Sequence, residues 1–75
     1  MFPNKMVQSF VGMKVQIEMK GNRALLEGVL ESVDDYLNMH LQDAEEIVDG
    51  QRKRSLGSVV LRGNNVIFIN PITEK

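Results

Sequence analysis

The chain has 75 residues, of which 43% are hydrophobic and 25% charged, as is typical of a single folded domain. It contains no cysteine and one histidine, which excludes disulfides and thiolate zinc sites and disfavours a histidine metal centre, so no cofactor is expected. The net charge of -1 excludes a generically basic nucleic-acid binder, and any polyanion binding must therefore be local.

The N-terminal segment 3–12 predicts a helix of two to three turns. Pro3 or Asn4 is a plausible start and Gly12 a plausible stop. The apolar residues of this segment recur at helical spacing: Met6, Val7, Phe10 and Val11. From residue 13 the period changes to two, which predicts a strand with one buried face formed by Met13, Val15, Ile17 and Met19. Residues 20–23, KGNR, then turn the chain.

The middle of the chain predicts two more strands. Segment 24–35, ALLEGVLESVDD, alternates irregularly, and a bend or bulge at Gly28 would restore its register. Segment 36–44, YLNMHLQDA, alternates regularly and predicts a strand with two distinct faces. Its apolar face holds Leu37, Met39 and Leu41, and its polar face holds Tyr36, Asn38, His40 and Gln42.

The last third predicts a charged hairpin and two further strands. Residues 45–54, EEIVDGQRKR, form a protruding hairpin with Asp49-Gly50 as its turn. Strands 58–62 and 65–70 are apolar at successive positions, so both of their faces should be covered. The polar residues between them are compatible with a simple tight turn in which Arg62 is incidental. One helix and five short antiparallel strands predict a strongly bent, barrel-like sheet of the SH3 or OB type.

A chain of this size has a small core, since it buries only roughly 60% of its unfolded surface. Without disulfides or a metal, oligomerisation is the remaining source of stability, and pairing of the apolar end strands between subunits would remove exposed edges. The longest apolar runs are a few residues, so neither a membrane span nor a signal peptide is expected. A cytoplasmic location is the default.

Two groups of residues resemble the motifs of a known family. Residues 28–38, GVLESVDDYLN, resemble the first Sm motif, with its glycine, apolar residue, aspartate, aromatic residue, leucine and asparagine. Residues 61–66, LRGNNV, resemble the second Sm motif, and the two occur at the family spacing. The likeness extends from the N-terminal helix to Pro71, and the chain is most similar to archaeal Sm-like proteins of the Sm and LSm family.

This resemblance implies a mainly all-β fold, in which an N-terminal helix precedes a bent five-stranded antiparallel SH3-like barrel. It implies a homo-oligomeric ring, a hexamer or a heptamer, that binds single-stranded uridine-rich RNA at its central pore and acts in RNA processing. Residues 1–75 would form one Sm-like domain: a helix at 3–12, the first motif region at 13–44, the charged hairpin at 45–55 and the second motif region at 56–71. No membrane or small-molecule substrate is implied.

In such proteins the loops after the second strand and before the fifth line the pore. Tyr36 and Arg62 can stack on the two faces of a base, an arrangement worth roughly 1–3 kcal/mol per base and tolerant of any base. The amide of Asn38 can match the O4 and N3–H edge of uracil, which makes Asn38 the candidate for selectivity. Asn64 stands where the family often has aspartate, and Gly63 serves the backbone geometry.

The remaining polar residues receive structural interpretations. Asp34 is expected to support the site by orienting Asn38 or loop amides without touching RNA. His40 is a solvated or hydrogen-bonded strand residue, and the basic run 52–54 is a solvated hairpin with a possible part in RNA approach. The serines have no histidine within a motif, so no enzyme is expected. The alternative function is a scaffold ring for protein partners with weak or no RNA binding.

Overall fold

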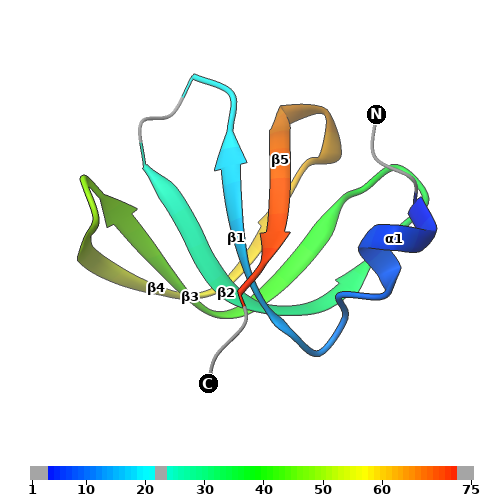
Figure 1. The fold of residues 1–75 in the computed structure, drawn as a ribbon, viewed down its shortest axis with the longest axis horizontal. Coiled ribbons are helices and arrows are strands. Elements are labelled where there is room, and N and C mark those ends of the chain that lie inside the picture. The colour runs from blue at the N-terminus through cyan, green and yellow to red at the C-terminus, as the bar shows by residue number, and fades with distance from the viewer. Residues whose placement is uncertain (1–3, 22–23, 73–75) are drawn as a thin grey trace.

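The computed structural model describes residues 4–21 and 24–72, which leaves the predicted helix start at Pro3 and residues 22–23 of the first turn outside the described part. The elements are α1 (Asn4–Gln8), β1 (Lys14–Met19), β2 (Leu25–Val33), β3 (Met39–Val48), β4 (Gln51–Leu61), the 3-10 turn η1 (Gly63–Asn65) and β5 (Val66–Pro71). The strands form one antiparallel sheet in the order β4-β3-β2-β1-β5 (Figure 1).

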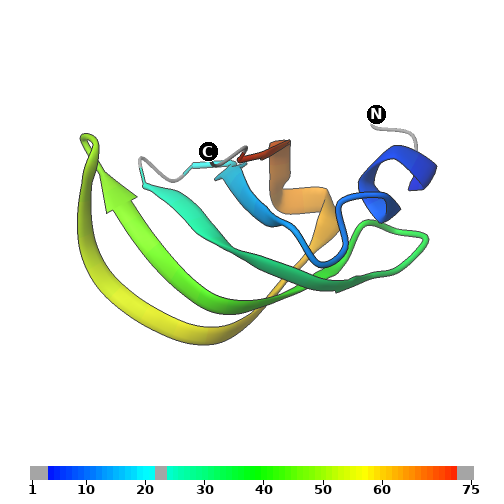
Figure 2. The same ribbon diagram turned by 60° about the horizontal axis from the view of Figure 1, so that its bottom comes forward.

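The sheet is strongly bent, and its long strands β2, β3 and β4 curve together beneath β1 and β5 (Figure 2). The predicted mainly-β fold, with a short N-terminal helix and five antiparallel strands, is therefore confirmed. No helix in the described ranges is long and apolar enough to cross a membrane.

The helix is shorter than the predicted 3–12. It begins at Asn4 and ends at Gln8, and the chain continues as turns in which the N–H groups of residues 9–11 donate to carbonyls three residues back. Gly12 then adopts a φ of 90°, which glycine tolerates, and its N–H donates to the carbonyl of Leu30 over 2.7 Å. Of the four apolar residues at helical spacing, Val7 is buried and Phe10 packs against the core, whereas Met6 and Val11 are exposed.

The core lies inside the bend of the sheet. In β1 Val15 and Ile17 are fully buried, as predicted, and Val7 of α1 is also fully buried. The predicted buried face is too long, because Met13 precedes the strand and is exposed and Met19 is only partly buried. Burial of one such side chain stabilises the fold by roughly 1.5–3 kcal/mol. The core residues come from α1 and all five strands or their flanks: Val7, Val15, Ile17, Leu26, Leu30, Met39, Leu41, Ala44, Leu61 and Ile69.

Gly28 lies at the predicted break in the alternation of β2. The pairing of β2 with β3 shifts register between Glu27 and Val29, and again further along the strand. A Cβ atom at Gly28 would lie 3.0 Å from the carbonyl oxygen of Gln42 and 3.1 Å from the Cα of Ala44. The two backbones therefore approach closely here, and a Cβ atom would require a shift of a few tenths of an ångström. The register shift confirms the bulge predicted at this position.

The third strand begins later than predicted. β3 starts at Met39, so Tyr36 and Asn38 lie in the β2–β3 loop and do not share a strand face. The cause is Leu37, whose φ of 64° places it in the left-handed region and breaks the extended run. Regular alternation resumes only with Met39 and Leu41, which are buried.

The β3–β4 hairpin has the predicted Asp49-Gly50 turn. Both residues have positive φ, 52° and 79°, as the tight hairpin turn that suits twisted strands requires. The hairpin forms the far end of the curved sheet in Figure 2, and residues 49–55 are exposed.

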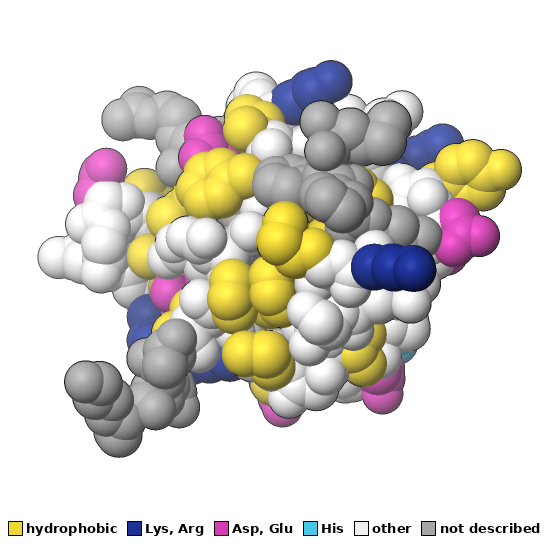
Figure 3. Space-filling view, turned by 45° about the vertical axis from the view of Figure 1, so that its right-hand side comes forward, with side chains coloured by type: hydrophobic (Ala, Val, Ile, Leu, Met, Phe, Trp, Pro, Cys, Tyr) yellow, Lys and Arg dark blue, Asp and Glu magenta, His cyan; other side chains and the backbone are white. Residues whose placement is uncertain are grey.

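The two edge strands, β4 and β5, keep apolar side chains in solvent. Val60 of β4 is 74% exposed and Ile67 of β5 is 47% exposed. Figure 3 shows apolar side chains gathered on one face of the molecule. Met6 of α1 and Val11 and Met13, which follow it in the chain, are also exposed. The successive apolar positions of the end strands are therefore not all covered within one chain.

Candidate functional site

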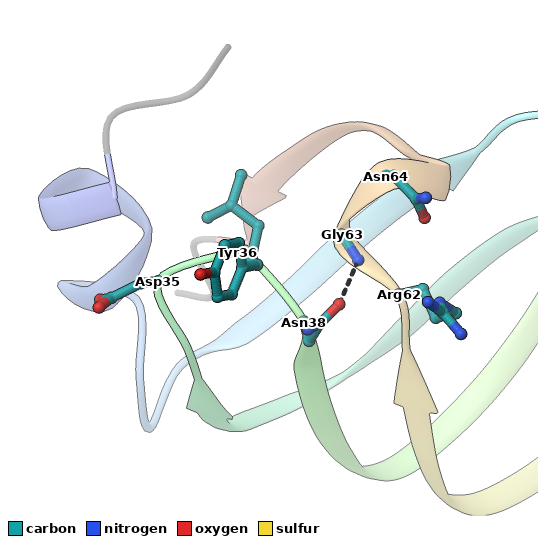
Figure 4. Close-up of a pocket in the computed structure, with 7 residues that line it drawn as sticks. Asp35, Tyr36, Asn38, Arg62, Gly63 and Asn64 are labelled. Carbon is teal, nitrogen blue, oxygen red and sulfur yellow. Dashed lines mark hydrogen bonds between the residues drawn. The ribbon is translucent and has the colours of Figure 1, made fainter.

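A pocket of about 530 Å³ lies between the β2–β3 loop and the segment that joins β4 to β5 (Figure 4). This volume is within the range of roughly 300–1,000 Å³ that is usual for ligand sites. The residues that line it are Asp35, Tyr36, Leu37, Asn38, Arg62, Gly63 and Asn64. All five residues that the sequence analysis named as candidate RNA contacts thus meet at one place.

Asp34 holds the β2–β3 loop in shape from beneath the pocket. Its Oδ1 accepts from the backbone N–H groups of Tyr36 (2.8 Å) and Asn38 (3.0 Å), and its Oδ2 accepts from Nδ2 of Asn38 (3.0 Å). The side-chain hydrogen bond from Asn38, followed by the backbone bonds, lowers the pKa of Asp34 in spite of the opposing desolvation. Asp34 is not one of the lining residues, so it acts on the pocket through Asn38.

Asn38 and Gly63 connect the two halves of the pocket. The backbone N–H of Gly63 donates to Oδ1 of Asn38 over 2.8 Å, as the dashed line in Figure 4 marks. A Cβ atom at Gly63 would lie 1.9 Å from the carbonyl oxygen of Tyr36 and 2.8 Å from the carbonyl carbon of Leu37. Glycine is therefore required here because two backbones approach closely, which agrees with the backbone role that the sequence indicated.

Leu37 and Asp35 line the pocket but were missed by the sequence analysis. Leu37 is half-buried and packs against the core, and this contact holds a positive φ that costs a bulky residue of order 1–3 kcal/mol. The neighbouring ring of Tyr36, which is 81% exposed, forms part of the pocket wall. Leucine gives no sequence signal for positive φ, and nothing distinguishes Asp35 from its neighbour Asp34.

Arg62 brings an available positive charge to the pocket. It is exposed, its backbone is extended (φ -87°, ψ 131°), and in the described part of the chain its guanidinium has no hydrogen-bond or ion-pair partner. In Figure 4 Tyr36 and Arg62 lie on either side of Asn38. Asn64 is exposed on the rim and adds an amide without adding negative charge.

His40 lies away from the pocket, in a polar network across three strands. Its Nε2 is 2.5 Å from Oγ of Ser58 on β4, and its Nδ1 is 3.1 Å from Oε1 of Glu31 on β2. Nε2 of Gln42 also donates to Oε1 of Glu31, over 2.7 Å. The sequence analysis did not connect these residues because cross-strand register, not motif spacing, brings them together. The network ties β2, β3 and β4 to one another.

The basic run 52–54 is largely engaged with acidic residues. Arg52 pairs with Glu45 and lies 3.3 Å from Glu27, and Arg54 lies 3.0 Å from Glu46. These carboxylates belong to β2 and β3, so the run supports the register of the hairpin. The charges of Arg52 and Arg54 are therefore less available to a ligand than that of Arg62.

The chain has the Sm fold, in which a short helix precedes a strongly bent five-stranded antiparallel sheet. Its pocket lies between the β2–β3 and β4–β5 connections. The sequence matches the LSM domain model over residues 5–71. The chain belongs to the LSM domain family, and the resemblance seen in the two sequence motifs is thereby confirmed.

Three solved structures are similar over nearly the whole chain. An Sm-like protein of Archaeoglobus fulgidus has a TM-score of 0.89 and 50% identity, and the match covers 96% of both chains. A heptameric archaeal Sm protein has a TM-score of 0.83 and 36% identity over 93% of this chain and all of its own. An Sm protein of Pyrococcus abyssii in complex with a uridine heptamer has a TM-score of 0.86 and 32% identity, and the match covers 96% of this chain and 100% of the Pyrococcus chain.

Proposed function

We propose that this protein forms a closed homo-oligomeric ring that binds single-stranded, uridine-rich RNA at its central pore. The observation that carries the proposal is the pocket in which Tyr36, Asn38 and Arg62 meet, in a chain similar to an Sm protein that is in complex with a uridine heptamer. The proposed role is RNA processing or metabolism in the cytoplasm, by binding and without a catalytic step.

The pocket offers two planar groups for a base. The exposed ring of Tyr36 and the exposed guanidinium of Arg62 can cover the two faces of one nucleobase, which is worth roughly 1–3 kcal/mol per base. Arg62 also lies where a nearby phosphate would meet a positive charge. Both contacts accept any base, so they supply affinity without sequence preference.

The edges of the sheet support the ring. β4 and β5 are the two unpaired edges, and each leaves an apolar side chain, Val60 or Ile67, exposed. Pairing of β4 with β5 of a neighbouring copy would satisfy both edges and would close a hexamer or heptamer. The similarity to a heptameric archaeal Sm protein favours such a closed assembly.

A ring also explains how a chain with a net negative charge could bind RNA. Each chain carries a net charge of -1, which offers a polyanion no general attraction. Rotational symmetry would bring one Arg62 per copy to the same opening. A locally positive track can then exist on an acidic protein, because the hairpin arginines are paired with carboxylates, whereas Arg62 has no such partner among the described residues.

Native mass spectrometry with and without oligouridine tests ring and binding together. We expect a single closed oligomer that takes up oligouridine, and a Val60→Lys variant that remains folded but no longer assembles. Val60 is suited to this test because its side chain is 74% exposed in one chain, so the new charge harms only a subunit contact. A monomer at micromolar concentration contradicts the ring. An assembled ring that binds protein partners but no oligouridine favours the scaffold function.

A further inference from the structure

Three polar side chains form a row across neighbouring strands, on the face of the sheet that points away from the core. Met39 and Leu41 are buried, so His40 between them projects from this opposite face. Oγ of Ser58 on β4 is 2.5 Å from Nε2 of His40, and Nδ1 of the same ring is 3.1 Å from Oε1 of Glu31 on β2. A hydroxyl beside an imidazole that a carboxylate orients from behind is the arrangement that activates a serine as a nucleophile.

Two irregularities in the strand pairing bring these side chains together. The pairing of β2 with β3 shifts register at Glu31, which is the extra residue of a bulge. The pairing of β3 with β4 shifts between Leu41 and Ala44, where Ser58 is the residue of β4 opposite the shift. Bulges re-aim side chains and are common next to active sites. The row therefore differs from a chance contact between regularly paired strands.

The hydrogen-bond partners determine which ring nitrogen of His40 carries the proton. A carboxylate only accepts hydrogen bonds, so Nδ1, which faces Glu31, is the protonated nitrogen of the neutral ring. Nε2 then has a free lone pair that accepts the hydroxyl proton of Ser58. Oε1 of Glu31 is itself held, because Nε2 of Gln42 donates to it over 2.7 Å. The ring is therefore held in the orientation and tautomer of a general base.

Small molecules can reach this row from solvent. Ser58 is exposed, and the side chains of His40 and Glu31 are 34% and 50% exposed. Pairing of β4 with a neighbouring copy would use backbone groups at the edge of the sheet, whereas these side chains project from its face. The negative charge of Glu31 near the serine favours uncharged substrates over anionic ones.

We propose that Ser58 is a nucleophile that accepts acyl groups from small, uncharged esters with good leaving groups, with His40 as its general base and Glu31 as a positioning residue. Oγ of Ser58 forms a bond to the ester carbonyl carbon while its proton passes to Nε2 of His40. The bond from that carbon to the leaving oxygen then breaks, and Nε2 gives the proton to the leaving oxygen. Water, activated by the same nitrogen, releases the acid and restores the serine. This activity is independent of RNA binding at the pocket.

The ester para-nitrophenyl acetate tests the acyl transfer on the whole protein at neutral pH. We expect a burst of one nitrophenol per chain, followed by slower turnover, with the acetyl group located on Ser58 by peptide mass spectrometry. Ser58→Ala should abolish the burst, and His40→Gln should slow it by about 100-fold, a usual contribution of a general base. Ser55→Ala is the matched control, because Ser55 is also an exposed serine of β4, and it should leave the burst unchanged.

A second probe and NMR separate this chemistry from other reactions of the ester. A fluorophosphonate forms a bond from phosphorus to the oxygen of an activated serine and loses fluoride. It should label Ser58 in the wild-type protein and should not label His40→Gln at that position. Glu31→Gln should slow the burst by about tenfold or more, because a wrongly oriented ring transfers the proton poorly. The nitrogen chemical shifts of the His40 ring should then show that Nδ1 no longer holds the proton preferentially, which loss of a merely structural residue would not cause.

The outcomes on unaltered protein decide the proposal even if a variant misfolds. Acetyl and phosphonyl groups on Ser58 in the wild-type protein, formed much faster than on Ser55, support it. Labelling of Ser58 no faster than of Ser55, or a burst that persists in Ser58→Ala, overturns it. An unchanged burst and an unchanged His40 tautomer in Glu31→Gln overturn the positioning role. None of these results alters the proposed RNA binding, because Ser58, His40 and Glu31 do not line the pocket.

Discussion

The β3–β4 hairpin carries three consecutive basic residues, whereas the segment between β4 and β5 carries Arg62 alone. In the hairpin, Arg52 and Arg54 are paired across strands with glutamates, and their charges serve the register of the sheet. In the pocket, Arg62 is exposed and has no partner in the described part of the chain. The number of charges in a segment is therefore a poor guide to the charge that a ligand can use.

Gly63→Ala should have the largest effect on the pocket, because the added Cβ would lie 1.9 Å from a backbone carbonyl oxygen that cannot move alone. We expect oligouridine affinity to fall by about 100-fold or more, since stacking and the edge contacts, each worth roughly 1–3 kcal/mol, are lost together. Fluorescence anisotropy at one fixed salt concentration measures this loss.

The matched control for that variant is Gly50→Ala in the hairpin turn. Gly50 has a φ of 79°, and a Cβ added there would meet no atom within 4 Å, so alanine adds strain without a collision. We expect it to lower the free energy of unfolding by about 1–2 kcal/mol and to leave binding unchanged. Equal losses of binding in both variants would mean that the close approach at Gly63 does not shape the site.

Arg62→Ala should come next in size. Removal of one stacking face and one unpaired charge from each pocket should weaken oligouridine binding by about 10- to 100-fold. Arg52→Ala and Lys53→Ala should each change it by less than about threefold, because they remove charge that is engaged or lies on the hairpin. A titration at several salt concentrations checks this, and equal losses from all three would point to diffuse attraction by the hairpin.

The hairpin turn, the bend at Gly28 and the β2–β3 loop show what the sequence could and could not predict. The Asp49-Gly50 turn was predicted because both residue types tolerate positive φ, and the bend at Gly28 because its alternation fails there. The pocket loop was predicted as strand because Tyr36, Leu37 and Asn38 alternate like one. The positive φ of Leu37 is imposed by tertiary packing on the core and leaves no local signal.

The site was predictable to the extent that motifs carry it. The five candidate contact residues of the two Sm-like motifs do line one pocket. The hydrogen bond between Asn38 and Gly63 joins two loops 25 residues apart in sequence, and the network of His40 with Ser58 and Glu31 depends on the register of β2, β3 and β4. Such shifts arise from the bend of the whole sheet, which periodicity within single segments does not specify.

Acidification should weaken the hydrogen bonds of Asp34 beside the pocket only below the ordinary aspartate range. The pKa of Asp34 is lowered in the folded protein, so the stabilisation from its three hydrogen bonds is fully present above about pH 4, the ordinary aspartate range, and is lost as pH falls through the folded pKa. We expect the Asp34 carboxyl carbon to titrate below ordinary aspartate by NMR. A midpoint at or above the ordinary value would mean that the loop does not hold this carboxylate as described.

The smallest effect should come from the ion pairs of the hairpin. Arg54 and Glu46 are 3.0 Å apart, but the arginine side chain is 66% exposed, so solvent screens the pair and it should be worth only about 0.2–1 kcal/mol. A double-mutant cycle with Arg54→Ala and Glu46→Ala, measured by urea unfolding at one protein concentration, isolates this coupling from other effects of each change. Oligouridine affinity should remain the same in all three variants, because the pair supports register and lies outside the pocket. A coupling near zero would mean that the Arg54–Glu46 pair does not stabilise the hairpin. A loss of RNA affinity in Arg54→Ala alone would show that Arg54 leaves Glu46 to contact an RNA phosphate. The hairpin charges would then be as available to RNA as the charge of Arg62.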